Sequence, residues 1–329
     1  MPDPRRHRLK AAVGLTASLL IAGLAAYVLF RTFQRIELAD VLRQMTEVPR
    51  TKLLLAAACA AGAFLTLALY EGIAVRYVKQ SLGVMKPAIT ALIAYPIGHA
   101  LGQTILSGSA LRYRMYTPAQ FSAIEVGATV LMCALPYGLA FGLLIDLALV
   151  LGADRLAEVF GVSRGWLVAA GVLGLAKDAG YVLFVINRKA PIRLGGWAVQ
   201  VPTPRMTALQ IAVGLVDVAL VSSVLYLLMP DSAGLAFLPF VAVYLASILA
   251  GALSHVPAGL GVLESVLLLL LPQVPPAELL AAVLLYRVIY EVIPLLVALA
   301  LWGAYELAAD DGVRVRMLRP RALRRDPPP

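Results

Sequence analysis

Residues 53–75 read LLLAAACAAGAFLTLALYEGIAV, an apolar run with one charged side chain, Glu71. A bilayer core about 30 Å thick is crossed by roughly 20 apolar residues in a helix, and backbone groups in lipid must be paired within the protein. The run therefore predicts a membrane-spanning helix. Comparable apolar blocks occupy residues 11–30, 88–106, 122–150, 166–186, 207–229, 235–271 and 279–303.

The composition of the whole chain agrees with this interpretation. Of its 329 residues, 61% are hydrophobic and 14% are charged, whereas soluble domains hold about 45–50% apolar and roughly 25% charged residues. The short alternating segments of a membrane β-barrel are absent from the sequence. We therefore predict an all-α polytopic membrane protein with about eight transmembrane helices, and the blocks leave no room for a soluble catalytic domain.

One block, 235–271, is too long for a single span, and Pro257, Gly259 and Gly261 interrupt its middle. It forms either two spans or a broken element that dips into the membrane and returns. A second glycine-interrupted segment lies at 96–109. Paired interruptions in the two halves of a chain are typical of transporter binding sites built from inverted repeats. We therefore expect one or two broken or re-entrant segments.

Positive charge predicts the orientation, because Lys and Arg gather on the cytoplasmic side. With eight crossings and a cytoplasmic N-terminus, 15 Lys and Arg flank the spans on the cytoplasmic side and 11 on the other. We predict a basic cytoplasmic N-terminus at 1–10, a membrane domain at 11–303 and a basic, disordered cytoplasmic tail at 304–329. The tail should attract anionic headgroups, so the net charge of +9 requires no nucleic acid.

Ionisable side chains inside the apolar blocks mark candidate functional positions, because each costs at least about 2.5–3.5 kcal/mol at the centre of a bilayer. The first cluster reads SGSALRYRMY at 107–116. The planar guanidinium groups of Arg112 and Arg114 can bind phosphate bidentately, and Tyr113 and Tyr116 suit the headgroup level. The cluster indicates either a phospholipid-headgroup site or a positive, aromatic loop that anchors the adjacent helices.

Two further clusters lie in the second half of the chain. His255 and Glu264 bracket the break HVPAGLGVLE. His255 is either a proton relay or a structural residue, and Glu264 requires a cation or a proton. In the last block Arg287 and Glu291 are four residues apart and share a helical face. Arg287 therefore either forms a buried ion pair or contacts the substrate.

Three motifs together resemble the lysylphosphatidylglycerol synthase transmembrane-region family, over residues 11–303. They are SGSALRYRMY at 107–116, HVPAGLGVLE at 255–264, and LYRVIY at 285–290 followed by Pro294. That domain forms the flippase half of the bacterial multiple peptide resistance factor and also occurs alone in inner-membrane proteins. The resemblance implies a multi-pass lipid translocase of the bacterial cytoplasmic membrane, with both termini cytoplasmic.

In the fused proteins this domain moves aminoacylated phosphatidylglycerol, such as the lysyl form, to the outer leaflet, which confers antimicrobial peptide resistance. We expect the present chain to act without the C-terminal aminoacyl-transferase domain of those proteins, which leaves its own substrate open. The resemblance and the clusters together predict the substrate-binding residues Arg112, Tyr113, Arg114, Tyr116, Glu71, Asp217, His255, Glu264, Arg287 and Tyr290. The predicted hinges are Gly108, Pro257, Gly259 and Gly261.

Two other classes of function compete with transport. One is a membrane-embedded enzyme that acts on lipid headgroups with His255 and Glu264 as acid and base, and the other is a scaffold that recruits a separate lipid synthase. The sequence holds no recognisable catalytic, nucleotide-binding or metal-binding motif. We therefore expect no catalytic residues, no metal and no cofactor. The expected partners are membrane phospholipids and a separate aminoacyl-lipid synthase, with a homodimer left open.

Overall fold

The computed structural model describes residues 27, 38–78, 82–101, 104–188, 192–194, 197–199 and 201–318. Among them, six helices are long and apolar enough to cross a membrane, which confirms an all-α polytopic membrane protein. The predicted first span at 11–30 lies almost entirely outside the described residues. The six are α3 (Arg50–Val78), α6 (Ala123–Leu151), α8 (Arg164–Asn187), α9 (Pro204–Leu228), α10 (Phe237–Ser254) and a continuous helix from Pro276 to Leu307.

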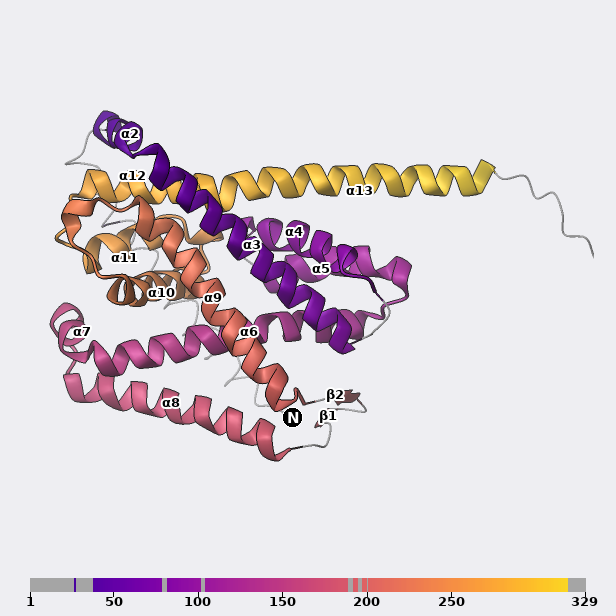
Figure 1. Cartoon of the computed structure of the whole chain (residues 1–329), viewed down its shortest axis with the longest axis horizontal. Coiled ribbons are helices and arrows are strands. Elements are labelled where there is room, and N and C mark those ends of the chain that lie inside the picture. The colour runs from indigo at the N-terminus through magenta and orange to yellow at the C-terminus, as the bar shows by residue number, and fades with distance from the viewer. Residues whose placement is uncertain are drawn as a thin grey trace, which may run out of the picture.

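The continuous helix near the C-terminus is built from three segments: α12 (Pro276–Tyr286), the π-helical turn η4 (Arg287–Val292) and α13 (Ile293–Leu318). Such π-helical turns inside α-helices are frequent at functional sites. α13 projects well beyond the rest of the bundle (Figure 1). The tail was predicted to be disordered from residue 304, but the helix continues to Leu318.

α3 and α9 lie side by side and run antiparallel through the molecule (Figure 1). Lys52 pairs with Asp231, which follows α9. Further along α3, Thr66 contacts Asp217. Later residues of α3 thus meet earlier residues of α9, as they do in antiparallel helices. Small buried residues allow the close approach, as is usual for helices packed within membranes. On α3 these are Ala56, Ala60, Ala63 and Ala74.

The first half of the chain contains a helical hairpin formed by α4 (Met85–Ala100) and α5 (Thr104–Tyr116). Its arms have 16 and 13 residues, fewer than the roughly 20 needed for a crossing. Tyr116, at the end of α5, packs in one cluster with Leu82, just before α4, so the chain returns to its starting face. The predicted span at 88–106 is therefore wrong. It covers parts of both arms, because an apolar count does not detect a tight turn.

The second half contains a corresponding hairpin formed by α10 and α11 (Val262–Leu270), joined through the short turn η3 (Pro257–Gly259). Left-handed φ values at His255, Ala258, Gly259 and Gly261 reverse the chain. The start of α10 and the residues after α11 line one cavity, which shows that the chain returns. The predicted broken element at 235–271 thus dips in and comes back.

The two halves repeat one order of elements: α3, α4, α5 and α6, then α9, α10, α11 and α12. Helices α9, α10 and α12 begin at residues 204, 237 and 276, which are 154, 152 and 153 residues after the starts of α3, α4 and α6 at 50, 85 and 123. Because α3 and α9 are antiparallel, the halves have opposite orientations. α4 contacts η3, so the first hairpin meets the break of the second.

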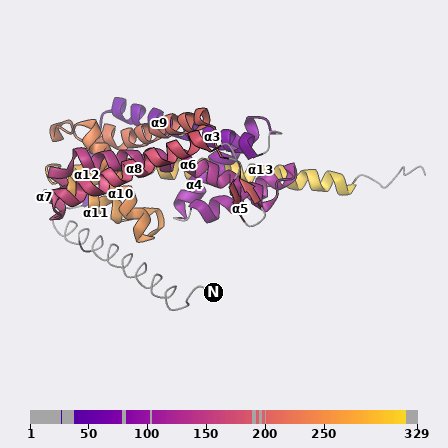
Figure 2. The ribbon, with the colours of Figure 1, turned by 90° about the horizontal axis from the view of Figure 1, so that it is seen from below.

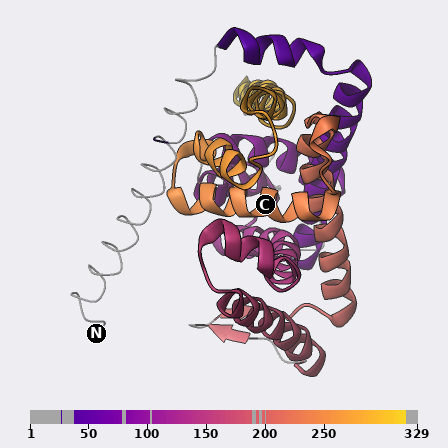
Figure 3. The same ribbon diagram turned by 90° about the vertical axis from the view of Figure 1, so that its left-hand side faces the viewer.

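The remaining elements surround this core. α2 (Leu38–Glu47) packs on α12 through Val41. α7 (Ala153–Phe160) joins α6 to α8, and α8 lies at the edge of the bundle farthest from α2 (Figure 3). Seen from below, the helices form a flat slab from which α13 projects at one end (Figure 2). The short elements are η1 (Thr117–Ala119), η2 (Asp231–Ala233) and the antiparallel strands β1 (Ile192–Leu194) and β2 (Trp197–Val199).

Gly214 on α9 has no room for a side chain. A Cβ there would collide with the carbonyl oxygen of Pro136 and lie 2.8 Å from Cβ of Ala140, both on α6. We expect Gly214→Ala to lower the free energy of unfolding by about 1–3 kcal/mol through overpacking, measured by thermal unfolding in detergent. Gly138→Ala is the matched control, since nothing lies within 4 Å of its Cβ position. Equal losses in the two variants would contradict this packing.

Candidate functional site

The first candidate site is centred on an ion pair between Glu71 of α3 and Arg112 of α5. Arg112 Nε donates to both carboxylate oxygens at 3.0 and 2.9 Å, and Nη2 donates to Oε2 at 2.8 Å. Tyr116 Oη and Cys133 Sγ also donate to Glu71, at 2.8 and 3.4 Å. The guanidinium lies 4.7 Å from the ring centroid of Tyr95. Neither charged side chain is more than 2% exposed, so Glu71 neutralises Arg112 in this conformation.

The other residues of the 107–116 motif lie apart from this pair. Arg114 is 60% exposed and pairs with Glu306 on α13, and Tyr113 is 47% exposed. Residues two apart on a helix point in different directions, so the two arginines do not share one site. Gly108, predicted to be a hinge, lies inside α5. A Cβ there would be 2.8 Å from Arg112 Nη1, so the glycine makes room for the guanidinium.

The second candidate site is the side chain of Arg287, which binds the break between α10 and α11. Its Nε donates to Glu264 Oε1 at 2.7 Å, and its Nη1 donates to Glu291 Oε2 at 2.9 Å. Nη1 also donates to the carbonyl oxygen of Ala258 at 3.1 Å, and Nη2 to that of Gly259 at 3.5 Å. Arg287 therefore joins two carboxylates to the backbone of the turn. Of the two alternatives that the sequence left open, an ion pair or a substrate contact, the structure shows ion pairs with both Glu264 and Glu291.

The predicted hinge residues lie in the same turn. His255 caps α10 in a left-handed conformation, is exposed, and places Nδ1 3.0 Å from the carbonyl oxygen of Leu253. Pro257 begins η3, and both Gly259 and Gly261 have positive φ, a conformation that favours glycine. The Gly261 N–H donates to Glu264 Oε2 at 2.9 Å, which links the turn to the first turn of α11.

Tyr290 connects the second site to α3 through a group of aromatic side chains. Its ring stacks on Tyr286 with centroids 5.6 Å apart and lies 5.4 Å from the ring of Phe64. Tyr286 and Tyr244 on α10 share a hydrogen bond between their hydroxyl groups at 2.8 Å. The rings therefore bring α3, α10 and the π-helical turn together in the core.

The third candidate site is Asp217, buried to 2% exposure on α9. Thr66 Oγ1 lies 2.6 Å from its Oδ1, and Tyr70 Oη donates to its Oδ2 at 3.1 Å. Thr66 and Tyr70 are four residues apart on α3 and therefore face α9 together. Sequence reasoning marked Asp217 but missed both partners. The sequence feature that could have indicated them is a pair of hydroxyl side chains four residues apart inside an apolar block.

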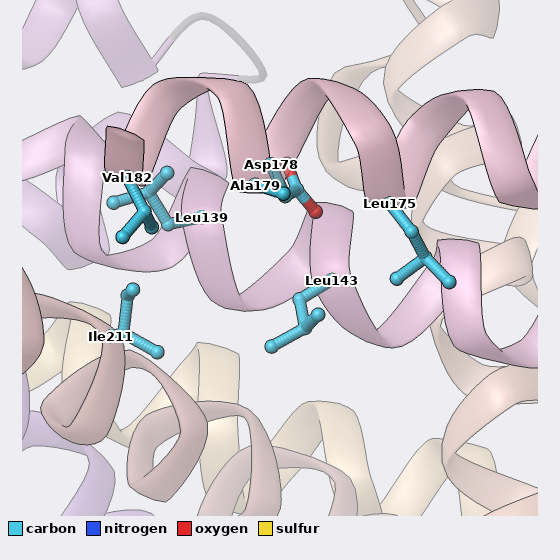
Figure 4. A pocket seen from close by; sticks show the side chains of 7 residues that line it. All are labelled: Leu139, Leu143, Leu175, Asp178, Ala179, Val182 and Ile211. Atoms are coloured by element: carbon cyan, nitrogen blue, oxygen red, sulfur yellow. The ribbon is translucent and has the colours of Figure 1, made fainter. Parts of the chain in front are cut away.

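A further polar cluster joins α6 to α8. Lys177 Nζ lies 2.9 Å from Asp178 and 3.5 Å from Asp146, a buried residue that sequence reasoning did not single out. Gly174 leaves the space that the Asp146 carboxylate occupies. Asp178 is also the polar residue among those lining a cavity of about 260 Å³, whose other lining residues are apolar (Figure 4). These are Leu139, Leu143, Leu175, Ala179, Val182 and Ile211.

The polar sites of the described residues are built from ion pairs and hydrogen bonds. In that part of the chain, no group of three or more His, Cys, Asp or Glu side chains is placed to hold a metal ion. Cys59 and Cys133 are free thiols.

A protein of Synechocystis sp., uncharacterized protein slr0712, is 33% identical over 269 residues, covering 82% of this chain and 84% of the relative. The chain belongs to the family of that protein. The inner membrane protein YbhN of Escherichia coli is 26% identical over 297 residues, covering 89% of this chain and 92% of YbhN. The chain is thus similar over most of its length to an inner-membrane protein, in agreement with the spanning helices.

No protein-family model matches the chain. The resemblance to the lysylphosphatidylglycerol synthase transmembrane-region family therefore stays a prediction. The similarity to YbhN covers nearly all of that protein. Most of the present chain is therefore related to an inner-membrane protein.

Proposed function

We propose that this protein is a lipid translocase of the bacterial cytoplasmic membrane and that it moves phospholipids with a cationic headgroup, such as an aminoacylated phosphatidylglycerol. The observation that carries the proposal is the charge of the bundle interior. Three carboxylates, those of Glu71, Glu264 and Glu291, lie against the two arginines Arg112 and Arg287. The third site adds the buried carboxyl group of Asp217. An interior with excess negative charge favours a positively charged guest over a neutral or anionic one.

Two hairpins that meet inside the bundle support a transport route. Each half of the chain contributes one, and α4 reaches the break η3 of the other hairpin. Irregular backbone at membrane depth is tolerated only where protein or a polar cavity surrounds it. In transporters with inverted repeats, the substrate site lies near such interrupted segments. The route therefore runs between the Arg112 and Arg287 sites.

The hairpins also sharpen the proposed orientation. Since each hairpin returns to its own side, the flanks 1–10, 76–87, 187–206 and 304–329 all fall on one face and hold 17 Lys and Arg. With the predicted span at 11–30, the flanks 31–52, 151–165, 229–236 and 271–275 would then fall on the other face and hold seven, so this division of both groups rests on that prediction as well as on the described hairpins. This bias is stronger than eight full crossings would give. By the positive-inside rule, the first group is cytoplasmic, and the basic tail would meet a separate lipid synthase there.

Reconstituted protein tests the proposed function. Fluorescent lysylphosphatidylglycerol placed in proteoliposomes should become accessible to dithionite beyond the outer-leaflet fraction, because the protein exchanges it between leaflets. The matched substrate is the same lipid with acetylated lysine amines, which carries two added acetyl groups and has lost its positive charges. We expect at least tenfold slower movement of the acetylated lipid. Equal rates for both lipids, or none above protein-free liposomes, would refute the proposal.

The same preparation separates transport from enzymatic action. A translocase leaves the lipid chemically unchanged, so mass spectrometry of lipid incubated with protein in detergent should show no product. Conversion of the headgroup in detergent, where no leaflets exist, would instead support the membrane-embedded enzyme.

A further inference from the structure

The hydrogen bonds around Asp217 indicate that its carboxyl group carries a proton. Thr66 Oγ1 lies 2.6 Å from Asp217 Oδ1 and also 2.6 Å from the carbonyl oxygen of Ala63. A threonine hydroxyl has a single proton and can donate it well to only one of them. If Asp217 is protonated, it donates to Thr66, which donates to Ala63, and both short contacts are then hydrogen bonds.

The surroundings of Asp217 also favour the protonated form. The titratable groups that face it are phenols: Tyr70 on α3, Tyr137 on α6 and Tyr290 on the π-helical turn. Among the described residues, none of the Lys, Arg or His side chains forms an ion pair with it. A buried carboxylate without a cation is costly, and the cost is relieved when the group takes up a proton.

A column of polar side chains leads from Asp217 to one face of the membrane. Gln210 and Thr207 follow at spacings of seven and ten toward the start of α9, and their side-chain polar atoms are buried with no hydrogen-bond partner. Tyr77 on α3 and Tyr181 on α8 also have buried hydroxyls without a partner and lie near each other. The Tyr181 hydroxyl also lies close enough to the Thr207 hydroxyl to interact with it, although the two do not meet the geometry of a direct hydrogen bond.

Buried polar atoms that lack a protein partner are the usual positions of internal water, which needs two to four such partners. The column offers five such atoms: the two of the Gln210 amide and the hydroxyls of Thr207, Tyr77 and Tyr181. It ends where α3 ends and α9 begins, the face assigned above to the cytoplasm. A chain of waters along it would connect Asp217 with that face.

We propose that Asp217 is a proton-binding site, reached by water along the α3–α9 interface, and that the protein exchanges this proton for the cationic headgroup of its substrate. The proton leaves the carboxyl O–H for a water of the column, and a carboxylate remains. The ammonium group of the lipid then supplies the positive charge that the proton took away. The coupling rests on the function proposed above, whereas the proton site does not.

The proton site is tested on the purified protein in detergent, without any transport. Infrared difference spectra between acid and alkaline pH should show the carbonyl band of a protonated carboxyl group. Because the chain holds 19 Asp and Glu, several carboxyl groups contribute to this band. We therefore expect one component of it to be missing from Asp217→Asn and present in Asp178→Asn, a control on α8. Asparagine nearly matches aspartate in size, and a single gel-filtration peak would show that the variant is folded. A spectrum of folded Asp217→Asn that lacks no component relative to the unaltered protein would overturn the proton site.

The column is tested with a variant that leaves Asp217 in place. In Gln210→Leu, the carbonyl band should remain, but its shift after transfer to deuterated water should slow at least tenfold, because the water path is interrupted. Leu209→Ala is the matched control, since Leu209 is exposed on the same helix. An unchanged rate in Gln210→Leu would overturn the path.

The coupling is tested in proteoliposomes with a pH gradient. With one proton exchanged per lipid, the steady-state ratio of lysylphosphatidylglycerol between leaflets should shift about tenfold per pH unit across the membrane. Asp217→Asn should abolish this dependence. Lipid movement that ignores the gradient would overturn the coupling while leaving the proposed function intact. If the infrared band of Asp217 changes with pH but no lipid moves, the proposed function would be refuted and only the proton site would be supported.

Discussion

Replacing Arg112 by alanine should destabilise the protein by about 3–5 kcal/mol, because it leaves the Glu71 carboxylate buried without its cation. Both side chains are at most 2% exposed, and three guanidinium hydrogen bonds to Glu71 would be lost. The loss should appear in the thermal unfolding of purified protein in detergent and as lower yield from the membrane.

Two variants show whether the effect arises from the stranded charge. Arg114→Ala removes an exposed pair with Glu306 and should leave the free energy of unfolding nearly unchanged, because ion pairs at the surface contribute little to stability. Combining Arg112→Ala with Glu71→Gln removes the uncompensated charge, so part of the stability should return. If the double variant is no more stable than Arg112→Ala alone, the buried pair is not the cause. The stability of the double variant would also show whether a loss of transport in Arg112→Ala comes from a less stable protein or from weaker headgroup binding.

Replacing Arg287 by alanine should release the turn between α10 and α11 and stop lipid movement. The substitution leaves Glu264 and Glu291 together without a cation and removes the donors to the carbonyl oxygens of Ala258 and Gly259. We expect a loss of about 3–5 kcal/mol in the free energy of unfolding. Hydrogen exchange of residues 255–261, followed by mass spectrometry, should speed up selectively.

Arg287→Lys distinguishes charge from geometry. Lysine keeps the positive charge but lacks the planar fork that reaches both carboxylates and the turn. It should therefore restore part of the stability but not the slow exchange of residues 255–261. Lys52→Ala is the control elsewhere in the bundle, because its partner Asp231 is 90% exposed. If hydrogen exchange of the turn is as slow in Arg287→Ala as in the unaltered protein, Arg287 does not hold the turn in place.

Much of the fold could be predicted from the sequence, because the lengths of the apolar blocks reflect the thickness of a bilayer. The block at 53–75 falls inside α3, and the block at 207–229 ends one residue beyond α9. The hairpin of α4 and α5 was missed, since its arms and turn together look as apolar as one span. In the second hairpin, three closely spaced glycine and proline residues revealed the turn.

The candidate sites were predictable as residues but not as partners. Buried charges are rare in apolar blocks, so Glu71, Asp217 and Arg287 stood out by composition alone. Which charge meets which depends on helix packing, and so Arg112 was expected on a phosphate and is found on Glu71. The hydroxyls of Thr66 and Tyr70 carry no charge, and nothing in the sequence placed them opposite Asp217.

The crossing of α3 and α9 has a mechanical consequence. Thr66 lies 16 residues after Arg50 and 12 before Val78, and Asp217 lies 13 after Pro204 and 11 before Leu228. Their contact is therefore a pivot point close to the middle of both helices. If α9 tilts on α3, the two ends of α9 move in opposite directions relative to α3, while the pivot point between Thr66 and Asp217 hardly moves. A carboxyl group held there would face each aqueous side in turn without travelling across the membrane.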